Sequence, residues 1–386
     1  MAVSEYCVIQ TDYQGITVSS VMKKIFNFDY FNIRKEIFLF LKIAFVKNFI
    51  SDKTANKNGS ILIVNPCLIG DFMASVLAIR DFIEKNSDKK IDIIVSPPLK
   101  SLAQRIIGVR NVFTAKSVYE RKLERVAEEN QNFDAYEKII VLRISPEAYR
   151  IIKHITAAKI EISLWHFLKY GFHMGGKLIA RRTPKPFREI NFEMLGGVSR
   201  DVPFNEIFKF KPEDYENINT LPAVRSPNKK VIIHTGSSWP MMRWEKEKWV
   251  KLLQKIHALG FFEFIFIGAE KDVEDYEYIS SHLKFKVYSV ISKLSLLELM
   301  LLLHSADYFI GVDSGPANMA RLAHLRNIVI LGPGPHMFMP SDSNDIIIDK
   351  SNGRGFYQRF FLKKNGFIQR IDAEEVYQAF YNLNLK

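Results

Sequence analysis

A strand–turn–helix unit within residues 308–334 constrains the fold of this chain more than any other feature of its sequence. An apolar strand, residues 308–312, leads into Asp313, Ser314 and Gly315, and a short helical stretch and a second apolar strand follow. The first amides of a helix have no intrahelical partners, and the helix dipole favours negative charge beside them. Glycine lets a ligand approach the backbone closely, and serine adds a hydroxyl. We therefore expect this turn to bind the diphosphate of a nucleotide.

Apolar strands and helical patterns alternate in two blocks of the chain. The first block begins after the polar stretch 51–60, and the second begins at Lys229, after the proline-containing stretch 221–228. We expect buried strands at residues 61–64, 91–95, 112–113, 138–142, 231–234, 262–267, 308–312 and 328–331. We expect helices at residues 72–83, 99–107, 245–259, 294–304 and 372–383. Such alternation predicts an α/β fold with parallel sheets and helices on both faces.

The composition is that of a globular protein long enough for two domains, with 47% hydrophobic and 25% charged residues among 386. Only Cys7 and Cys67 are present, which argues against a disulfide framework and a cysteine-based metal site. Residues 1–10 do not resemble a signal peptide, so we expect a cytoplasmic protein. The formal net charge of +12 implies an anionic partner. Because zinc-finger spacing, an RNP-type motif and an arginine-rich run are missing from the sequence, we expect no nucleic-acid partner.

Residues 22–50 form a basic, aromatic-rich helical segment within an N-terminal extension, residues 1–58. Six Lys and Arg residues against two acids give this segment a charge of 6 − 2 = +4. Its apolar run is interrupted by Lys42 and is too short to cross a bilayer, which takes about 20 residues. One interpretation is an amphipathic helix that lies on an anionic membrane surface. The alternative is a helix packed on the first domain, which the nearly continuous apolar run suits equally.

Two further segments, taken with residues 308–334, give the chain a resemblance to a known family. Residues 61–80 have the pattern of a first strand, a Gly-Asp turn and a first helix, and residues 231–244 have that of a strand and the loop opening a second domain. In order and spacing, the three segments resemble glycosyltransferase family 9, the bacterial heptosyltransferases of lipopolysaccharide core synthesis. The resemblance covers roughly residues 59–380.

The resemblance implies the GT-B architecture, in which two Rossmann-like domains face each other across a cleft. An acceptor domain is then expected at residues 59–220 and a nucleotide-sugar donor domain at residues 221–386. The resemblance also implies an inverting glycosyltransferase with a nucleotide-diphosphate sugar donor and a lipopolysaccharide-core or other lipid-linked glycan acceptor. More narrowly, it implies ADP-heptose as the donor. Such a transfer needs a base for the acceptor hydroxyl, donors for the departing diphosphate, and a cleft that excludes water.

Asp71 is the residue for which pattern and resemblance lead to different roles. It follows strand 61–64 where a helix begins, and from its residue type alone the helix N-cap is the favoured interpretation. The resemblance reverses this preference, because the acid of the family's Gly-Asp pair is its catalytic base. One rotamer does not easily fill both roles.

The resemblance assigns the donor's phosphates to small and polar residues at two strand ends and to one arginine. These residues are Thr235, Gly236, Ser237, Arg243, Asp313, Ser314, Gly315 and Asn318. A guanidinium suits phosphate oxygens, although family members commonly carry Lys where this chain has Arg243. Asn318 stands where the family often has His. The alternative for the 313–315 turn is a tight turn that merely links strand to helix.

The donor's ribose is assigned by the resemblance to an acid after strand 262–267, which is either Glu270 or Asp272. No DxD motif and no pair of His at i, i+4 occurs, so we interpret His234, His304, His324 and His336 as structural. We therefore expect a metal-independent enzyme without a cofactor. The sequence contains neither a P-loop nor a dinucleotide fingerprint after strand 61–64.

Two alternatives to a glycosyltransferase remain open at the level of sequence. A nucleotide-sugar 2-epimerase shares the architecture but needs several acids and a His in the cleft, and no such dense cluster stands at the strand ends. A non-catalytic GT-B protein that binds a nucleotide sugar or a glycan is the other, and Asp71 and Arg243 argue against it. If the enzyme acts on a lipid-linked acceptor, we expect it at the inner face of the cytoplasmic membrane as a peripheral protein.

Overall fold

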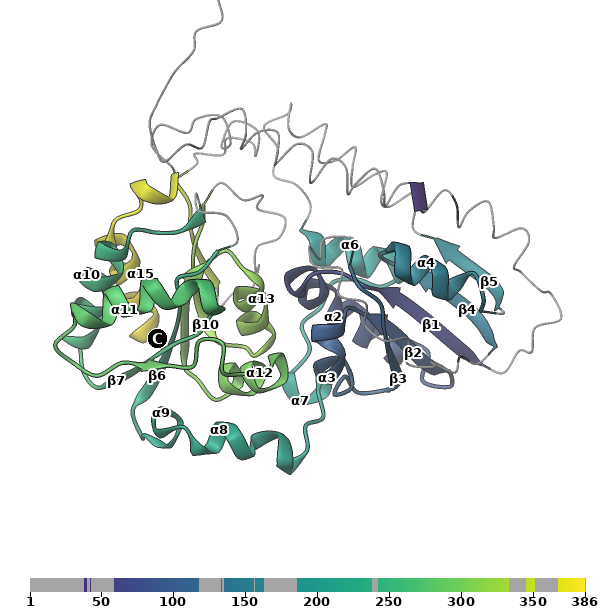
Figure 1. The fold of residues 1–386 in the computed structure, drawn as a ribbon, viewed down its shortest axis with the longest axis horizontal. Helices are drawn as coiled ribbons and strands as arrows, with labels where there is room; N and C mark the ends of the chain where they lie inside the picture. The colour runs from purple at the N-terminus through teal and green to yellow at the C-terminus, as the bar shows by residue number, and fades with distance from the viewer. Residues whose placement is uncertain are drawn as a thin grey trace, which may run out of the picture.

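The computed structural model of this chain is an α/β structure built on two separate parallel sheets (Figure 1). The structure describes residues 38, 39, 42, 59–117, 133, 135–155, 157–162, 186–237, 242–332, 345–350 and 367–385. The first sheet lies on the right of Figure 1 and the second on the left, and the expected α/β class is confirmed.

Within the described residues, the first sheet has five strands, all paired in parallel. Its strands are β1 (Ser60–Asn65), β2 (Lys90–Val95), β3 (Val109–Thr114), β4 (Tyr136–Val141) and β5 (Ala157–Ile162), in the spatial order β3-β2-β1-β4-β5. Its helices are α2 (Ile69–Lys85), α3 (Lys100–Ala103, after the 3-10 turn η1, Pro97–Leu99), α4 (Pro146–Ile152) and α6 (Phe187–Met194). Strand β1 is buried along its whole length, as a central strand covered on both faces should be.

The second sheet has six described strands, again all parallel. They are β6 (Lys229–His234), β7 (Phe262–Phe266), β8 (Tyr288–Ser289), β9 (Tyr308–Val312), β10 (Arg326–Ile330) and β11 (Asp345–Ile348), in the order β11-β10-β9-β6-β7-β8. Its helical elements are α10 (Lys246–His257), η4 (Glu270–Asp272), α11 (Val273–Ser281), α12 (Leu296–His304), α13 (Gly315–Leu322), η6 (Phe367–Arg370) and α15 (Ala373–Asn384). Helix α10 shows why these elements form, because its apolar residues recur at helical spacing and Trp249, Leu252, Leu253 and Ile256 are all buried.

Each sheet has one point where the strand order reverses direction. In the first sheet the chain moves outward from β1 through β2 to β3 and then returns to β4 on the other side of β1. In the second sheet it moves outward from β6 through β7 to β8 and returns to β9 beside β6. Ligands of open α/β sheets bind at the carboxyl ends of strands at such switch points. Helices α2 and α13 follow β1 and β9 directly, so both helices begin at these points.

The two halves touch where α2 meets α13, near the centre of Figure 1. A Cβ placed on Gly70 would lie 3.6 Å from the Cα of Gly315, and one placed on Gly315 would lie 3.1 Å from Cγ2 of Ile69. Behind the glycines, one hydrophobic cluster includes Phe72 of α2 and Ala317 of α13, so the two halves share a continuous core. The N-terminal ends of both helices are thereby held against each other.

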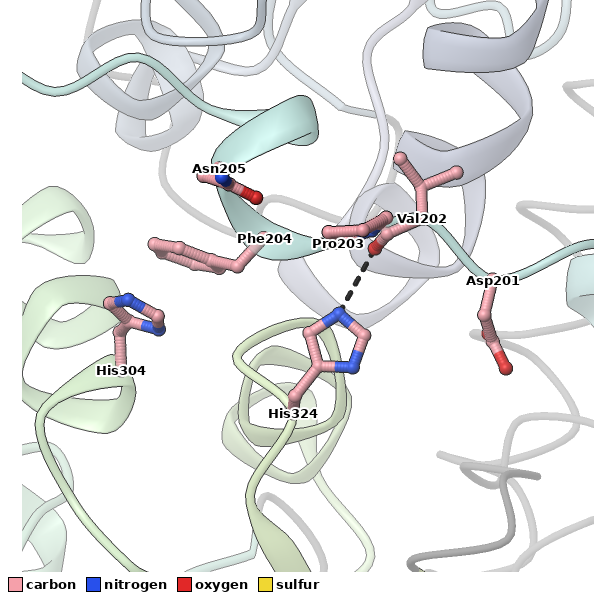
Figure 2. A pocket seen from close by; sticks show the side chains of 7 residues that line it. All are labelled: Asp201, Val202, Pro203, Phe204, Asn205, His304 and His324. Atoms are coloured by element: carbon pink, nitrogen blue, oxygen red, sulfur yellow. Dashed lines mark hydrogen bonds between the residues drawn. The ribbon is translucent and has the colours of Figure 1, made fainter.

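A linker of short helical elements joins the two halves on another side of the molecule. It contains α7 (Phe204–Ile207), η2 (Pro212–Tyr215), α8 (Glu216–Thr220) and α9 (Pro222–Arg225), and the expected domain boundary at 220/221 falls between α8 and α9. A groove of about 630 Å³ lies beside this linker. Figure 2 shows the residues that line it, which are Asp201, Val202, Pro203, Phe204, Asn205, His304 and His324.

Polar contacts cross between the halves at this groove. The Nε2 atom of His324 lies 3.0 Å from the Val202 carbonyl oxygen, and Arg321 Nη2 lies 3.3 Å from the Asp201 carboxylate (Figure 2 shows the His324 contact). His304 stacks on Phe204 with ring centroids 3.8 Å apart. These contacts give His304 and His324 structural partners in the packing of the two halves.

Most of the strands expected from the sequence are present, and the differences have physical reasons. The expected helix 99–107 is wrong, because α3 ends at Ala103 and the chain then turns toward Gly108, which has a positive φ of 87°. Strand β3 is longer than the expected 112–113, and β5, β8, β11, α4, α6 and α11 were not expected at all. Their patterns are short or mixed, so tertiary packing rather than local periodicity determines them.

The membrane interpretation concerns residues 22–50, which lie outside the described residues apart from Phe38, Leu39 and Lys42. Those three residues are helical, Leu39 is buried in the core of the first half, and Phe38 is exposed. The Lys42 ammonium lies 4.6 Å from the centre of the Phe38 ring. No helix in the described part of the chain is long and apolar enough to span a membrane.

Candidate functional site

Asp71 lies in the first turn of α2 and does not cap it. The helix begins at Ile69, three residues before the expected start, and its N-cap is Leu68, whose side chain makes no capping bond. The N-cap interpretation of Asp71 is therefore wrong. The apolar periodicity begins only at Phe72, because Gly70 and Asp71 interrupt it, and this hid the first turn of the helix in the sequence.

The Asp71 carboxyl is half-buried beside one cation. Burial raises the pKa of Asp71 above its usual 3.8, and the charge of Arg143 partly opposes this. Arg143 is the second residue after β4, and its guanidinium lies 4.9 Å from the centre of the Phe187 ring. A carboxyl whose pKa is moved toward neutrality is suited to accept a proton at physiological pH.

The loop between β1 and α2 is fixed by hydrogen bonds from buried side chains. Asn65 Nδ2 donates to Ser75 Oγ at 2.9 Å, and Ser75 Oγ donates to the Phe72 carbonyl at 2.7 Å. Ser96 Oγ, at the end of β2, donates to the Cys67 carbonyl at 2.8 Å. These bonds tie the start of α2 to the strand ends, so the position of Asp71 is set by the sheet.

The turn after β9 has the anion-binding geometry expected from the sequence. Ser314 is the N-cap of α13, and its hydroxyl accepts a hydrogen bond from the Ala317 amide at 3.3 Å. Asn318 Nδ2 donates to the Ser314 carbonyl at 3.2 Å, so Asn318 lies in the first turn of this helix. Gly315 opens the helix and faces Gly70, which places this turn against the N-terminal end of α2.

Asp313 is half-buried at the end of β9, and burial raises its pKa to about 7. It lies two residues before the glycine that contacts α2. Asp71 and Asp313, which neighbour Gly70 and Gly315 in the sequence, therefore both hold their protons to a higher pH than ordinary aspartates.

The loop after β6 lies directly on the carboxylate of Asp272. Thr235 and Gly236 are buried, and a Cβ placed on Gly236 would lie 2.3 Å from the Asp272 carboxylate. His234, the last residue of β6, is also buried, and burial lowers its pKa to about 4, so it is neutral at physiological pH. Ser237 is only partly buried, so it is more accessible than Thr235 and Gly236.

Arg243 is held by two carboxylates. Its Nη2 lies 2.7 Å from Asp272 Oδ1, and its Nη1 lies 2.7 Å from Asp275 Oδ2. Its backbone is fixed as well, because Gln369 Nε2 donates to the Arg243 carbonyl at 3.0 Å and the neighbouring Trp244 is buried. About a quarter of the Arg243 side chain remains exposed, so this anchored cation can still reach an anion.

The two acids proposed for ribose differ sharply in their surroundings. Glu270 is exposed in the first residue of η4. Asp272 is 1% exposed, and its carboxylate accepts hydrogen bonds from Arg243 and from the Ala269 amide, the latter at 2.9 Å. Only Glu270 has a carboxylate open to a ligand.

The predicted residues therefore form two neighbouring groups. Asp71 and the 313–318 turn meet where α2 touches α13, and the 235–237 loop, Arg243 and Asp272 pack together at the ends of β6 and β7. The pairing of His234 with Gly311 joins the strands that carry the two groups. The roles of these residues stay predictions.

Sequence reasoning missed Arg143 and Asp275. Arg143 directly follows the expected strand 138–142, so its position at a carboxyl end was a usable signal. Asp275 lies inside α11 and is recognisable only from its ion pair with Arg243. Among the described residues, no cluster of three or more His, Cys, Asp or Glu side chains could hold a metal ion, and metal independence stays a prediction.

We expect Asp313→Asn to stabilise the protein more at about pH 8 than at about pH 5. The folded-state pKa of about 7 lies above the usual 3.8, so the folded state binds more protons and loses stability as the pH rises between these values. Asparagine does not ionise, so the variant avoids this loss of stability at the higher pH. Thermal unfolding at both pH values measures it, with the exposed Asp88→Asn as control. Equal shifts at both pH values would contradict the burial of an ionisable Asp313.

Comparisons with known proteins find a matching family model and one curated relative. Residues 191–354 match the family model of glycosyltransferase family 9 (heptosyltransferase). Lipopolysaccharide heptosyltransferase 1 of Campylobacter coli is 28% identical over 186 residues, which cover 46% of this chain. The match spans about half of that relative, 53% of its length.

Solved structures with similar folds cover most of the chain. A family 9 glycosyl transferase from Veillonella parvula has a TM-score of 0.67 at 16% identity, covering 85% of this chain and 97% of its own. The heptosyltransferase WaaC of E. coli, solved with ADP, has a TM-score of 0.62 at 15% identity, covering 84% and 99%. The ADP-heptose lipopolysaccharide heptosyltransferase II of E. coli has a TM-score of 0.61 at 15% identity, covering 84% and 98%. These solved structures give this chain the GT-B fold, and residues 191–354 are similar to glycosyltransferase family 9.

Proposed function

We propose that this protein is an inverting glycosyltransferase that moves a sugar from a nucleotide-diphosphate donor to a hydroxyl of a glycan acceptor. The observation that carries the proposal is the contact between Gly70 and Gly315. It brings Asp71, from the first half, beside the anion turn of the second half. This reaction requires two parts, a carboxylate that can accept a proton and a turn that can hold a diphosphate.

In the proposed reaction, Asp71 removes the proton of the acceptor hydroxyl as its oxygen attacks the anomeric carbon of the donor sugar. The bond from that carbon to the diphosphate oxygen breaks, and the nucleoside diphosphate leaves with the electron pair. Arg143 beside Asp71 helps to keep the base ionised before the proton arrives. Because the developing negative charge is taken up by Arg243 and by helix amides, we propose a reaction that uses neither metal nor cofactor.

The donor would lie along the ends of β6, β7 and β9. We assign its diphosphate to the 313–318 turn, the 235–237 loop and Arg243, and its ribose to Glu270, whose carboxylate is exposed. ADP-heptose is the donor we propose, since the E. coli relatives are described with ADP and as an ADP-heptose enzyme. Lipopolysaccharide core is the corresponding acceptor, by analogy with the Campylobacter coli relative.

Asp71→Asn tests the base. We expect the rate of sugar transfer to fall by about 10²–10⁴-fold, because the amide cannot accept the proton, while nucleotide affinity is retained. Initial rates and calorimetric titration with the nucleoside diphosphate measure the two effects. Glu84→Gln, an exposed carboxylate on the same helix, is the matched control and should leave the rate unchanged. A wild-type rate for Asp71→Asn would show that Asp71 is not the base.

Glu270→Gln tests the ribose assignment. We expect the affinities for the nucleoside and for its diphosphate to fall by the same factor, about tenfold or more, since both ligands contain the ribose. Titration of ADP-, UDP-, GDP- and CDP-sugars against the wild-type protein first identifies the nucleobase of the donor. Glu274→Gln, exposed on the neighbouring helix, serves as control. Unchanged affinity of the Glu270 variant would remove this residue from the site.

We also propose that the protein works at an anionic membrane surface, where a lipid-linked acceptor would be found. Its net charge of +12, the exposed Phe38 and the adjacent Lys42 support this. The full chain should sediment with vesicles that contain anionic lipid, and added salt should release it. Neutral vesicles are the control, and equal recovery with both vesicle types would exclude an electrostatic attachment.

A further inference from the structure

Among the described residues, the carboxylate of Asp272 is buried and has protein groups as its partners. Its Oδ1 is 2.7 Å from Arg243 Nη2, and its Oδ2 accepts a hydrogen bond from the Ala269 amide at 2.9 Å. The residue is 1% exposed. A ribose could reach this carboxylate only by displacing these partners, so Asp272 is poorly placed to bind a ligand itself.

Two glycines show what Asp272 does instead. A Cβ on Gly236 would lie 2.3 Å from the carboxylate, and a Cβ on Gly268 would lie 2.7 Å from its Oδ2. Real Cβ atoms do not approach other atoms this closely, so only glycine fits at either position. The loop after β6 and the loop after β7 therefore both rest on one buried carboxylate, which sets their spacing.

The same carboxylate orients Arg243. The guanidinium bridges Asp272 and Asp275 through Nη2 and Nη1, and Nη2 also lies 3.4 Å from the Lys271 carbonyl oxygen. In the part of the chain that the structure describes, none of these contacts uses Nε. A guanidinium held at two corners loses little freedom when it meets a phosphate, which strengthens binding.

We propose that Asp272 is a positioning residue that holds Arg243 and the 235–237 loop at a fixed distance from Glu270. The inference rests on the proposed function, because it assigns diphosphate to Arg243 and ribose to Glu270. Asp272 then makes no contact with the donor. It sets the distance between the groups that hold the diphosphate and the group that holds the ribose, so the two parts of the donor are recognised by one prearranged unit.

The test compares the nucleoside diphosphate that binds the wild-type chain with its matching nucleoside, by calorimetric titration of the full chain. In Asp272→Asn, the diphosphate should bind about tenfold more weakly, whereas the nucleoside should bind nearly as in wild type. A direct ribose contact would weaken both ligands equally, as expected for Glu270→Gln. Equal losses in Asp272→Asn would therefore overturn the proposal.

A double-mutant cycle with Arg243→Ala separates positioning from a general structural defect. Because Asp272 acts partly through Arg243 and partly through the 235–237 loop, Asp272→Asn should cost less diphosphate affinity in Arg243→Ala than in the wild-type chain. Additive losses would overturn the proposal. Denaturant unfolding checks that each variant remains cooperatively folded. Should Asp272→Asn fail to fold, Asp275→Asn carries the test, since it frees the other corner of the guanidinium and leaves the loop spacing intact.

For Asp275→Asn, we expect a smaller loss of affinity that is again selective for the diphosphate. Equal losses of affinity for both ligands would overturn the proposal.

The outcomes also separate this inference from the proposed function. A wild-type chain that binds no nucleoside diphosphate at all would refute both. Wild-type binding with equal losses in the variants would refute only the positioning role of Asp272.

Discussion

The contact between the N-terminal ends of α2 and α13 is the constraint on which the rest of the site depends. Two helices that start at the switch points of separate sheets meet there, and Gly70 and Gly315 lie so close that a Cβ on Gly70 would be 3.6 Å from the Gly315 Cα. A larger residue at position 315 would press on Ile69 and separate the helices. Glycine at position 315 therefore lets the N-terminal end of α2, which carries the proposed catalytic acid, lie against the anion turn of the other half.

This contact also has an electrostatic consequence. Both helix ends carry partial positive charge, so their approach is unfavourable unless an anion lies beside them. Asp71 and Asp313 stand next to the contact, but burial raises the pKa of each, which limits how much negative charge they supply. We infer that a donor diphosphate would complete the balance of charge. On this view, the same feature that joins the two halves makes the site selective for an anionic ligand.

The sequence predicted the parts of this site that depend on local pattern, and it missed those that depend on contacts between distant segments. The turn after residues 308–312 and its helix were predicted because apolar strand, small residues and helix follow one another in the chain. The enclosure of Asp272 and the pairing of Arg243 with Asp275 join residues about thirty positions apart, and no local pattern encodes them. The start of α2 was misplaced because Gly70 and Asp71 break its apolar periodicity.

The apolar core that the two halves share opposes their separation when a donor enters the site. Opening the two halves at the site would expose apolar surface around Phe72 and Ala317, which water opposes. The linker side belongs to the same core through Phe204 and Ile207, and it adds polar contacts such as that between His324 and Val202. Separation of the two halves at the α2–α13 contact is therefore opposed chiefly by the loss of apolar burial. Ligand binding between the helix ends would favour the closed arrangement, so the same apolar contact that resists opening also helps to exclude water once the donor is bound.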